Sequence, residues 1–213
     1  MGRRVLPKLD PEVDFTGHLG EVDDLVAPFD PQSLFDQPRE LEIEIGSGKG
    51  LFVTTESGRR PERNFLGNEI AHKYCRFAAY RLAQNNRNNA CMLCGDGLKL
   101  FREFLPDECA VAVHVYFPDP WWKARHRRRR VMQPGFIADI QRVLSQGGIF
   151  HFWTDVEEYF EETLGLMAEH SDLSGPHDVD ARPAEHDMDY RTHFERRMRI
   201  NDHPVFRSQF VKS

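Results

Sequence analysis

The sequence lacks any apolar run that could cross a membrane. Hydrophobic residues make up 40% of its 213 positions, but they occur in short stretches, whereas a membrane-spanning helix needs about 20 consecutive apolar residues. The first residues, MGRRVLPKLDPEVDF, also lack the apolar segment of a secretory signal. We therefore expect a soluble, cytoplasmic protein with no membrane partner.

Cysteine is scarce as well. The four cysteines, at positions 75, 91, 94 and 109, are too few for a disulfide scaffold in a chain of this length and are consistent with reduced, buried thiols. Cys91 and Cys94 have a spacing that occurs in zinc sites, but they lie in an apolar run typical of a strand, where residues three apart point to opposite faces. Because no second cysteine pair could complete such a site, we expect no metal.

Positive charge is outnumbered by negative charge. The chain has 28 Lys and Arg against 34 Asp and Glu, which gives a net charge of -6. This excludes a protein coated with positive charge throughout, as nonspecific DNA-packaging proteins are. A local basic patch remains compatible with this balance.

The length and the distribution of turn-forming residues predict one domain with an amino-terminal arm. A chain of this length can form one α/β domain with a core but is short for two. Residues 1–39 are rich in Pro and Asp and show little periodicity, which is typical of a loosely ordered arm or a covering loop. We therefore assign residues 1–39 to an arm and residues 40–213 to a single domain.

From Leu41 onward, short apolar runs alternate with longer amphipathic segments. The predicted strands cover residues 41–45, 64–70, 90–94, 110–117 and 149–154, and the predicted helices cover residues 98–104, 134–144 and 156–170, with another helix ending near Gln84. Residues 171–189 lack periodicity and predict a surface excursion before a final element at 205–211. Strands separated by helices form βαβ units, so we expect a parallel sheet with helices on both faces and a ligand at the carboxyl ends of the strands.

A glycine-rich turn, GSGKG at residues 46–50, follows the first predicted strand. Such a turn lets the backbone approach a ligand at the start of a helix. It is not a phosphate-binding P-loop, because Lys49 is followed by Gly50, and it is not the dinucleotide fingerprint, because Leu51 occupies the last glycine position. An S-adenosylmethionine loop remains, although a turn of this kind is also common as a tight connection.

Acidic residues follow the second and third predicted strands. Glu69 lies about 20 residues beyond the glycine turn, where an acidic side chain can accept hydrogen bonds from both ribose hydroxyls of a nucleoside. Asp96, between Gly95 and Gly97, could face the adenine side of the same ligand, although an Asp between glycines is equally typical of a loop. The turn and Glu69 together favour a cofactor that contains a nucleoside.

The segment after the fourth predicted strand is the most informative. It reads PDPWWKARHRRRR from Pro118 to Arg130 and contains an acid, two prolines, two tryptophans and six Lys or Arg residues. At the carboxyl edge of a sheet, this combination favours a reaction site next to a nucleic-acid-binding surface. A solvated face or a targeting signal is the alternative for an arginine run. The position of this run directly after a strand, in an acidic protein, favours the binding surface.

These motifs together resemble the bacterial tRNA (guanine-N7-)-methyltransferase family. The resemblance rests on residues 44–50, 65–69 and 118–130, with further matches at Thr154-Asp155 and at residues 190–197, and it covers about residues 40–211. It implies a Rossmann-like class I methyltransferase fold with a mostly parallel seven-stranded sheet and helices on both faces. It also implies transfer of the methyl group of S-adenosylmethionine to N7 of a guanine in the variable loop of tRNA, which gives 7-methylguanosine.

The resemblance also assigns the residues of the site. It implies contacts to S-adenosylmethionine by Glu44, Gly46, Gly48, Glu69, Asp96 and Asp119. Asp119 would also be the catalytic residue, at the reaction centre. The resemblance further implies guanine contacts by Lys123, Asp155, Thr192, His193, Phe194 and Glu195, and RNA-backbone contacts by Arg125, Arg127, Arg128, Arg129 and Arg130. Met198 stands where the family usually has Gly.

Two other functions fit parts of the pattern. A nucleotide-cofactor oxidoreductase would use the glycine turn and Glu69 equally well, but it would not need the arginine run. A noncatalytic RNA-binding subunit would keep the arginine run, but it would not need the acids Glu44, Glu69 and Asp119. The pattern is compatible with a monomer or a homodimer.

Overall fold

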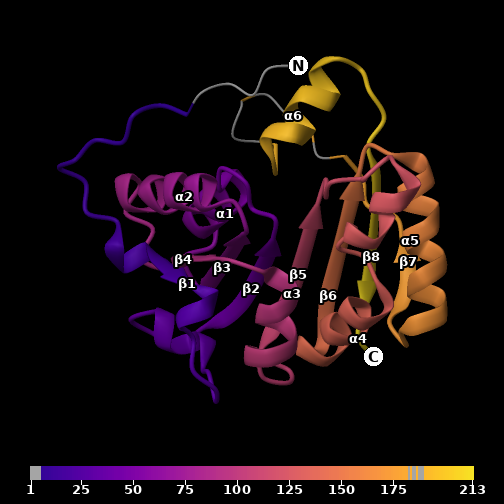
Figure 1. The fold of residues 1–213 in the computed structure, drawn as a ribbon, viewed down its shortest axis with the longest axis horizontal. Helices are drawn as coiled ribbons and strands as arrows, with labels where there is room; N and C mark the ends of the chain where they lie inside the picture. The colour runs from indigo at the N-terminus through magenta and orange to yellow at the C-terminus, as the bar shows by residue number, and fades with distance from the viewer. Residues whose placement is uncertain (1–5, 182, 184–185, 187–189) are drawn as a thin grey trace.

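One central sheet organises the protein in the computed structural model, which describes residues 6–181, 183, 186 and 190–213 (Figure 1). Across these residues the sheet has eight strands, in the order β1-β4-β3-β2-β5-β6-β8-β7. The strands are β1 (Leu19–Glu21), β2 (Glu40–Ile45), β3 (Arg63–Glu69), β4 (Ala90–Cys94), β5 (Ala110–Tyr116), β6 (Leu144–Thr154), β7 (Ser174–His177) and β8 (Phe206–Val211). All neighbouring strands are parallel except β8, which runs antiparallel to β6 and β7.

The mostly parallel sheet predicted from the sequence is confirmed, with one strand more than expected in the described residues. The residue pattern did not predict β1, which lies in the arm and pairs with β4, or β7, which lies in the expected surface excursion at residues 171–189 and pairs with β8. The arm also contains short 3-10 turns at Thr16–His18, Val22–Asp24 and Pro31–Leu34. Regular structure therefore begins before Leu41, because β1 joins the sheet through its backbone and needs no apolar periodicity of its own. The division of the chain at residue 39 stays a prediction.

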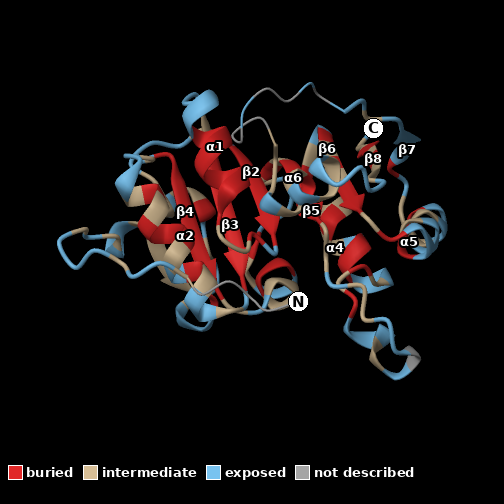
Figure 2. Cartoon of the chain, turned by 90° about the horizontal axis from the view of Figure 1, so that it is seen from above, coloured by how far each residue is buried: buried red, intermediate tan, exposed pale blue. Residues whose placement is uncertain are grey.

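Helices cover both faces of the sheet, as predicted. α1 (Leu51–Arg59) and α2 (His72–Gln84) pack on one face. The other face is covered by α3 (Gly97–Lys99), which continues as a π-helical turn through Phe104, and by α4 (Pro134–Val143) and α5 (Glu157–His170). Figure 2 shows the buried residues concentrated along the strands and the inner sides of these helices. No helix within the described ranges is both long and apolar enough to span a membrane.

Side-chain alternation along β4 separates the two cysteines that share the zinc-like spacing. Cys91 belongs to the core beneath α4, whereas Cys94 belongs to the core beneath α2. This confirms that residues three apart on the strand point to opposite faces. Cys91 and Cys94 therefore cannot bind one metal ion together.

Candidate active site

A cavity of about 320 Å³ lies at the carboxyl ends of β2 and β5. One side is formed by the glycine turn between β2 and α1, and the other by the start of α6 (His193–Ile200). Figures 1 and 2 show α6 above the carboxyl ends of the central strands. The residues that line the cavity include Glu44, Gly46, Gly48, Tyr116, Phe117, Thr192, His193 and Phe194. This is the edge of the sheet at which the sequence predicts a ligand.

Hydrogen bonds hold the glycine turn against β3. The amides of Gly46 and Ser47 both donate to the carbonyl oxygen of Asn68, at 2.9 Å. Gly46 and Gly48 have φ angles of 76° and 55°, a left-handed conformation that glycine adopts without strain. A Cβ atom at Gly46 would meet no atom within 4 Å. The turn therefore leaves open space where Gly46 lines the cavity.

Glu69 supports this turn from the end of β3. Its Oε2 accepts a hydrogen bond from the amide of Gly48 at 2.8 Å, and its Oε1 accepts one from the amide of Ala71 at 2.8 Å. The sequence predicts that Glu69 binds a ribose. Since a carboxylate oxygen can accept more than one hydrogen bond, ribose hydroxyls would share these oxygens with the backbone amides.

Glu44 is the buried acid of the cavity. It is only 3% exposed, and its Oε2 forms no hydrogen bond with the described residues. Burial raises the pKa of Glu44 to about 8, and the nearby negative charge of Glu69 contributes in the same direction. A buried polar atom without a partner costs free energy. A ligand group that donates a hydrogen bond or carries positive charge would therefore be stabilised here.

The segment Thr192–Glu195 forms the amino-terminal cap of α6. Thr192 Oγ1 accepts a hydrogen bond from the amide of Glu195 at 2.9 Å, and Glu195 Oε2 accepts one from the amide of Arg191 at 2.7 Å. Glu195 is buried, and its Oε1 lies 3.3 Å from the guanidinium groups of both Arg199 and Arg207. Both oxygens of Glu195 fix α6, and the guanine contact that the sequence predicts for Glu195 stays a prediction. The pattern T-x-x-E was a signal for this cap.

Two aromatic rings close the cavity on the side of α6. The ring of Phe194 lies 5.0 Å from the ring of Phe117, centroid to centroid. His193 is exposed beside them, with its Nε2 3.3 Å from Arg81 Nη1. Thr192, His193 and Phe194 thus lie at the cavity, as the predicted guanine contacts require.

Arg191 is a residue that sequence reasoning missed. Its Nη1 donates to the Tyr116 hydroxyl at 3.2 Å, and its guanidinium lies 5.4 Å from the centroid of the Trp153 ring and 5.7 Å from that of Phe52. Tyr116 and Phe52 both line the cavity. Arg191 therefore ties the start of α6 to the wall of the cavity, a role for which a single Arg in the sequence gives no signal.

The loop after β5 presents most of its charges to solvent. Asp119 and Lys123 are exposed, as are Arg125 and residues 127–129. The guanidinium of Arg129 lies 5.2 Å from the centroid of the Trp121 ring, and Arg127 forms an ion pair with Glu158 of α5. Asp119 follows the strand end that borders the cavity but is not among the described residues that line it.

Arg130 differs from the other arginines of this loop. It is 2% exposed, its Nε donates to the carbonyl oxygen of Pro120 at 2.7 Å, and its guanidinium lies 4.5 Å from the centroid of the Tyr159 ring. It also forms an ion pair with Glu162. Arg130 therefore anchors the loop to α5, and its guanidinium is not presented to RNA as the sequence predicts.

Asp96 and Asp155 lie on opposite sides of the cavity. Asp96 is exposed after β4, where it accepts a hydrogen bond from the amide of Leu98 at 2.9 Å and caps α3. Asp155 is half-buried after β6. Because β4 and β6 flank β3, β2 and β5 in the sheet, the two acids are placed toward opposite ends of a ligand bound across these strands.

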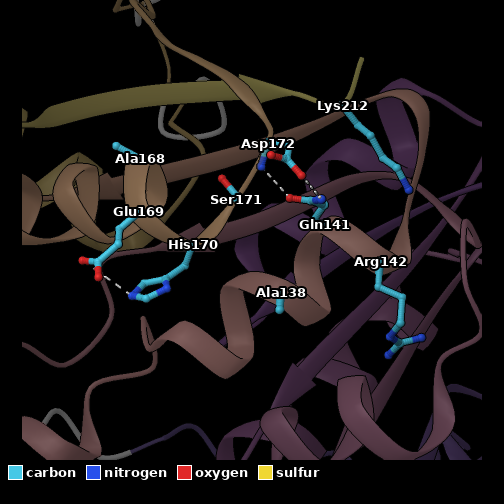
Figure 3. A pocket seen from close by; sticks show the side chains of 9 residues that line it. All are labelled: Ala138, Gln141, Arg142, Ala168, Glu169, His170, Ser171, Asp172 and Lys212. Carbon is cyan, nitrogen blue, oxygen red and sulfur yellow. Dashed lines mark hydrogen bonds and ion pairs between the residues drawn. The ribbon is translucent and has the colours of Figure 1, made fainter.

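A larger depression lies at the opposite edge of the sheet, where α4 and α5 end (Figure 3). Its polar side chains pair with one another or with nearby groups. Gln141 hydrogen bonds to Asp172, Arg142 pairs with Asp107 at 2.9 Å, and Lys212 donates to the carbonyl oxygen of Leu144 at 2.6 Å. Ligands of open α/β sheets bind at the other edge, so we place the active site at the smaller cavity.

Comparison with known proteins assigns the chain to a family. A family model described as "Putative methyltransferase" matches residues 38–208. The tRNA (guanine-N(7)-)-methyltransferase of Rhodopirellula baltica is 49% identical over 218 residues, which cover all of this chain and 80% of that protein. The chain belongs to the tRNA (guanine-N(7)-)-methyltransferase family.

Other relatives of this methyltransferase support the same family and fold. The tRNA (guanine-N(7)-)-methyltransferase of Sodalis glossinidius is 32% identical over 189 residues, which cover 87% of this chain and 78% of that protein. Two solved structures share the fold. Precorrin-6y C5,15-methyltransferase from Geobacter metallireducens has a TM-score of 0.57 at 16% identity, covering 83% of this chain and 82% of that one. The aminoglycoside resistance methyltransferase NpmB1 has a TM-score of 0.56 at 17% identity, covering 84% and 89%. The family and the Rossmann-like methyltransferase fold predicted from the sequence are both confirmed.

Proposed function

We propose that this protein transfers the methyl group of S-adenosylmethionine to N7 of a guanine in the variable loop of tRNA, forming 7-methylguanosine in the cytoplasm. Its membership of the family supports this activity. The structural observation that supports it most is the position of the cavity with buried Glu44 beside the exposed basic loop that follows β5. One edge of the sheet offers a site for a small charged cofactor next to a surface for a polyanion.

Residues of the glycine turn and of the neighbouring strand ends would hold S-adenosylmethionine. When bound, this cofactor supplies a methyl group on a sulfonium, ready for displacement. Gly46 and Gly48 leave room for close approach to the backbone. Glu44, with its unpartnered Oε2, would accept a hydrogen bond from the amino group of the methionine part. Glu69 would bind the ribose and Asp96 would face the adenine.

The target guanine needs positioning more than it needs a base. N7 has an in-plane lone pair and no proton, so its attack on a methyl group requires no prior proton removal. The protein must hold N7 in line with the methyl group, at about 3 to 3.5 Å. Asp119 would orient the base and stabilise the positive charge that the base acquires. Lys123, Asp155 and residues 192–195 would contact its other edges, and Glu195 would also fix α6.

The exposed arginines of the loop after β5 would bind the RNA backbone. Arg125 and residues 127–129 are accessible, and Arg127 would exchange its ion pair with Glu158 for a phosphate. Each phosphate contact releases counterions, so RNA binding should weaken steeply as salt is raised. Arg130 would serve this surface by holding the loop in place.

Methyl transfer from labelled S-adenosylmethionine to unmodified tRNA tests the proposal. We expect label at N7 of a variable-loop guanine, located by mass spectrometry and by strand scission at 7-methylguanosine. The matched control is the same tRNA with its variable-loop guanines replaced by adenines, which should accept no label. Label at another atom or base would contradict the assignment, and binding of cofactor and tRNA without transfer would favour a noncatalytic RNA-binding subunit.

A further inference from the structure

Three side chains that commonly bind metals meet at the edge of the sheet farthest from β7. Glu21 ends β1, Cys94 ends β4, and the parallel pairing of these strands places the two residues directly opposite each other. His72 is the first residue of α2, the helix that packs on β4 and β1. Three segments that are distant in the sequence therefore bring a carboxylate, an imidazole and a thiol together, beside the proposed cofactor site, since Cys94 pairs with Glu69 across the sheet.

The spacing of these groups suits a small metal ion. One ligand atom from each side chain lies within 4.8 Å of the other two, and His72 Nε2 lies 3.4 Å from Glu21 Oε1. Around a tetrahedral zinc ion, with ligands at about 2.0 to 2.3 Å, neighbouring ligand atoms are about 3.3 to 3.8 Å apart. His72 Nε2 and Glu21 Oε1 already have this separation, and small side-chain rotations would bring the Cys94 sulfur into the same range.

The chemistry of the donors favours zinc over magnesium or calcium. Thiolate and imidazole are ligands of zinc and related transition metals, whereas magnesium and calcium prefer sets made only of oxygen. Because zinc binds cysteine as the thiolate, a zinc ion at this cluster would release the proton of the Cys94 thiol.

The exposure of the three side chains leaves a path for the ion. Cys94 is only 4% exposed, whereas the side chains of His72 and Glu21 are 59% and 38% exposed. The thiol thus lies at the inner end of an open cluster. A water molecule entering from the solvent side can supply the fourth ligand, as in zinc sites with three protein ligands.

We propose that Glu21, His72 and Cys94 form a zinc-binding site that fastens the amino-terminal strand β1 to β4 and α2. The sequence predicts no metal because Cys91 and Cys94, the two cysteines with a zinc-like spacing, lie in one strand, and in the structure they face opposite sides. The structure completes the ligand set from β1 and α2 instead. In the zinc-bound protein, the bond from Glu21 to the metal ties the arm to the ligands on α2 and β4, in addition to the short strand pairing.

Metal binding to the full chain, after chelator treatment and dialysis, tests this site. Co²⁺ should bind with about one equivalent and give the thiolate-to-cobalt charge-transfer absorption of a cysteine ligand. Zn²⁺ should displace it and raise Tm by about 5 to 10 °C when free Zn²⁺ is a hundredfold above its Kd. It should also slow amide exchange at Gly20 and Glu21.

His72→Ala and Cys94→Ser should each abolish the absorption and the Tm shift. His72 is exposed, so its replacement should leave the apo fold intact, which keeps the test valid if Cys94→Ser folds poorly. The matched controls His170→Ala and Cys109→Ser should retain both signals. The proposal is overturned if wild type shows no thiolate band, or if both signals survive in His72→Ala.

Discussion

Replacing Glu44 with Gln should weaken the binding of S-adenosylmethionine and remove its dependence on pH. With a pKa of about 8, the buried carboxyl group is protonated at neutral pH. A positively charged amino group of the cofactor favours the carboxylate, so binding should release the proton. The affinity of the wild-type protein should therefore rise with pH below about pH 8. Gln has no proton to release and should show no such rise.

The structure sets the size of this effect. Below the pKa of Glu44, release of one proton per binding event changes Kd about tenfold for each pH unit. A hydrogen bond to a charged group contributes about 1.5 to 3 kcal/mol. Near pH 7.5, proton release costs about 0.8 kcal/mol of this gain, so Glu44→Gln should raise Kd by about 3- to 40-fold.

The same group affects stability in the absence of ligand. Its pKa is about 8 in the folded protein against an ordinary value of 4.5, so the contribution of Glu44 is fully present below about pH 4.5 and is lost as pH rises through 8. Over that window the free energy of unfolding should fall by up to about 5 kcal/mol relative to Glu44→Gln, since each pKa unit corresponds to about 1.4 kcal/mol.

Isothermal titration calorimetry from about pH 6 to about pH 7.5, in buffers with different ionisation enthalpies, counts the released protons. Wild type should release about 0.9 proton near pH 7, and Glu44→Gln should release none. The exposed-surface variant Glu103→Gln is the matched control and should behave as wild type. An affinity for wild type that does not change with pH, or a proton release that persists in Glu44→Gln, would refute the reasoning.

Three further sets of substitutions test the methyl transfer, the binding of RNA and the anchoring of the loop separately. Asp119→Ala should lower kcat about a hundredfold without changing Tm, because Asp119 is exposed; unchanged turnover would remove it from the reaction centre. Replacing residues 127–129 with Ala should raise KM for tRNA and reduce the salt slope by about 3, while calorimetry shows cofactor affinity intact; loss of cofactor binding would contradict this role. Arg130→Ala should lower the free energy of unfolding by about 3 kcal/mol in chemical denaturation, whereas the exposed control Arg128→Ala should change it by less than about 0.5 kcal/mol. Equal effects of these two variants would contradict the anchoring role.

Sequence periodicity located the central strands because these strands are buried on both faces. β4 and β5 are almost continuous apolar runs, which parallel pairing between two helical layers requires. The edge strands β1 (LGE) and β7 (SGPH) have only three and four residues; β1 is half-buried and β7 is exposed. They join the sheet through backbone hydrogen bonds, so their residue types carried no signal for a strand.

Some site residues could be predicted from the sequence and others could not, for a similar reason. A glycine turn after a strand was sufficient to predict where a ligand would bind, because carboxyl ends of parallel strands share one edge. Glu195 is different, since a glutamate suits a guanine edge or a helix cap, and only the fold places Arg207 of β8 against it. Arg130 carries the same side chain as its neighbours in the run. Its burial depends on Tyr159 of α5, which is distant in the sequence.

The position of β8 between β6 and β7 imposes an order on the folding of the enzyme during its synthesis. β6 and β7 both precede β8 in the chain, so β7 cannot join the sheet during synthesis until β8 has been made. The helix α6 is synthesised between β7 and β8. A nascent chain that already carries the glycine turn and the basic loop therefore has an incomplete cofactor site, because α6 does not yet line the cavity. Cofactor capture on the ribosome should begin only when β8 emerges and α6 settles over the strand ends.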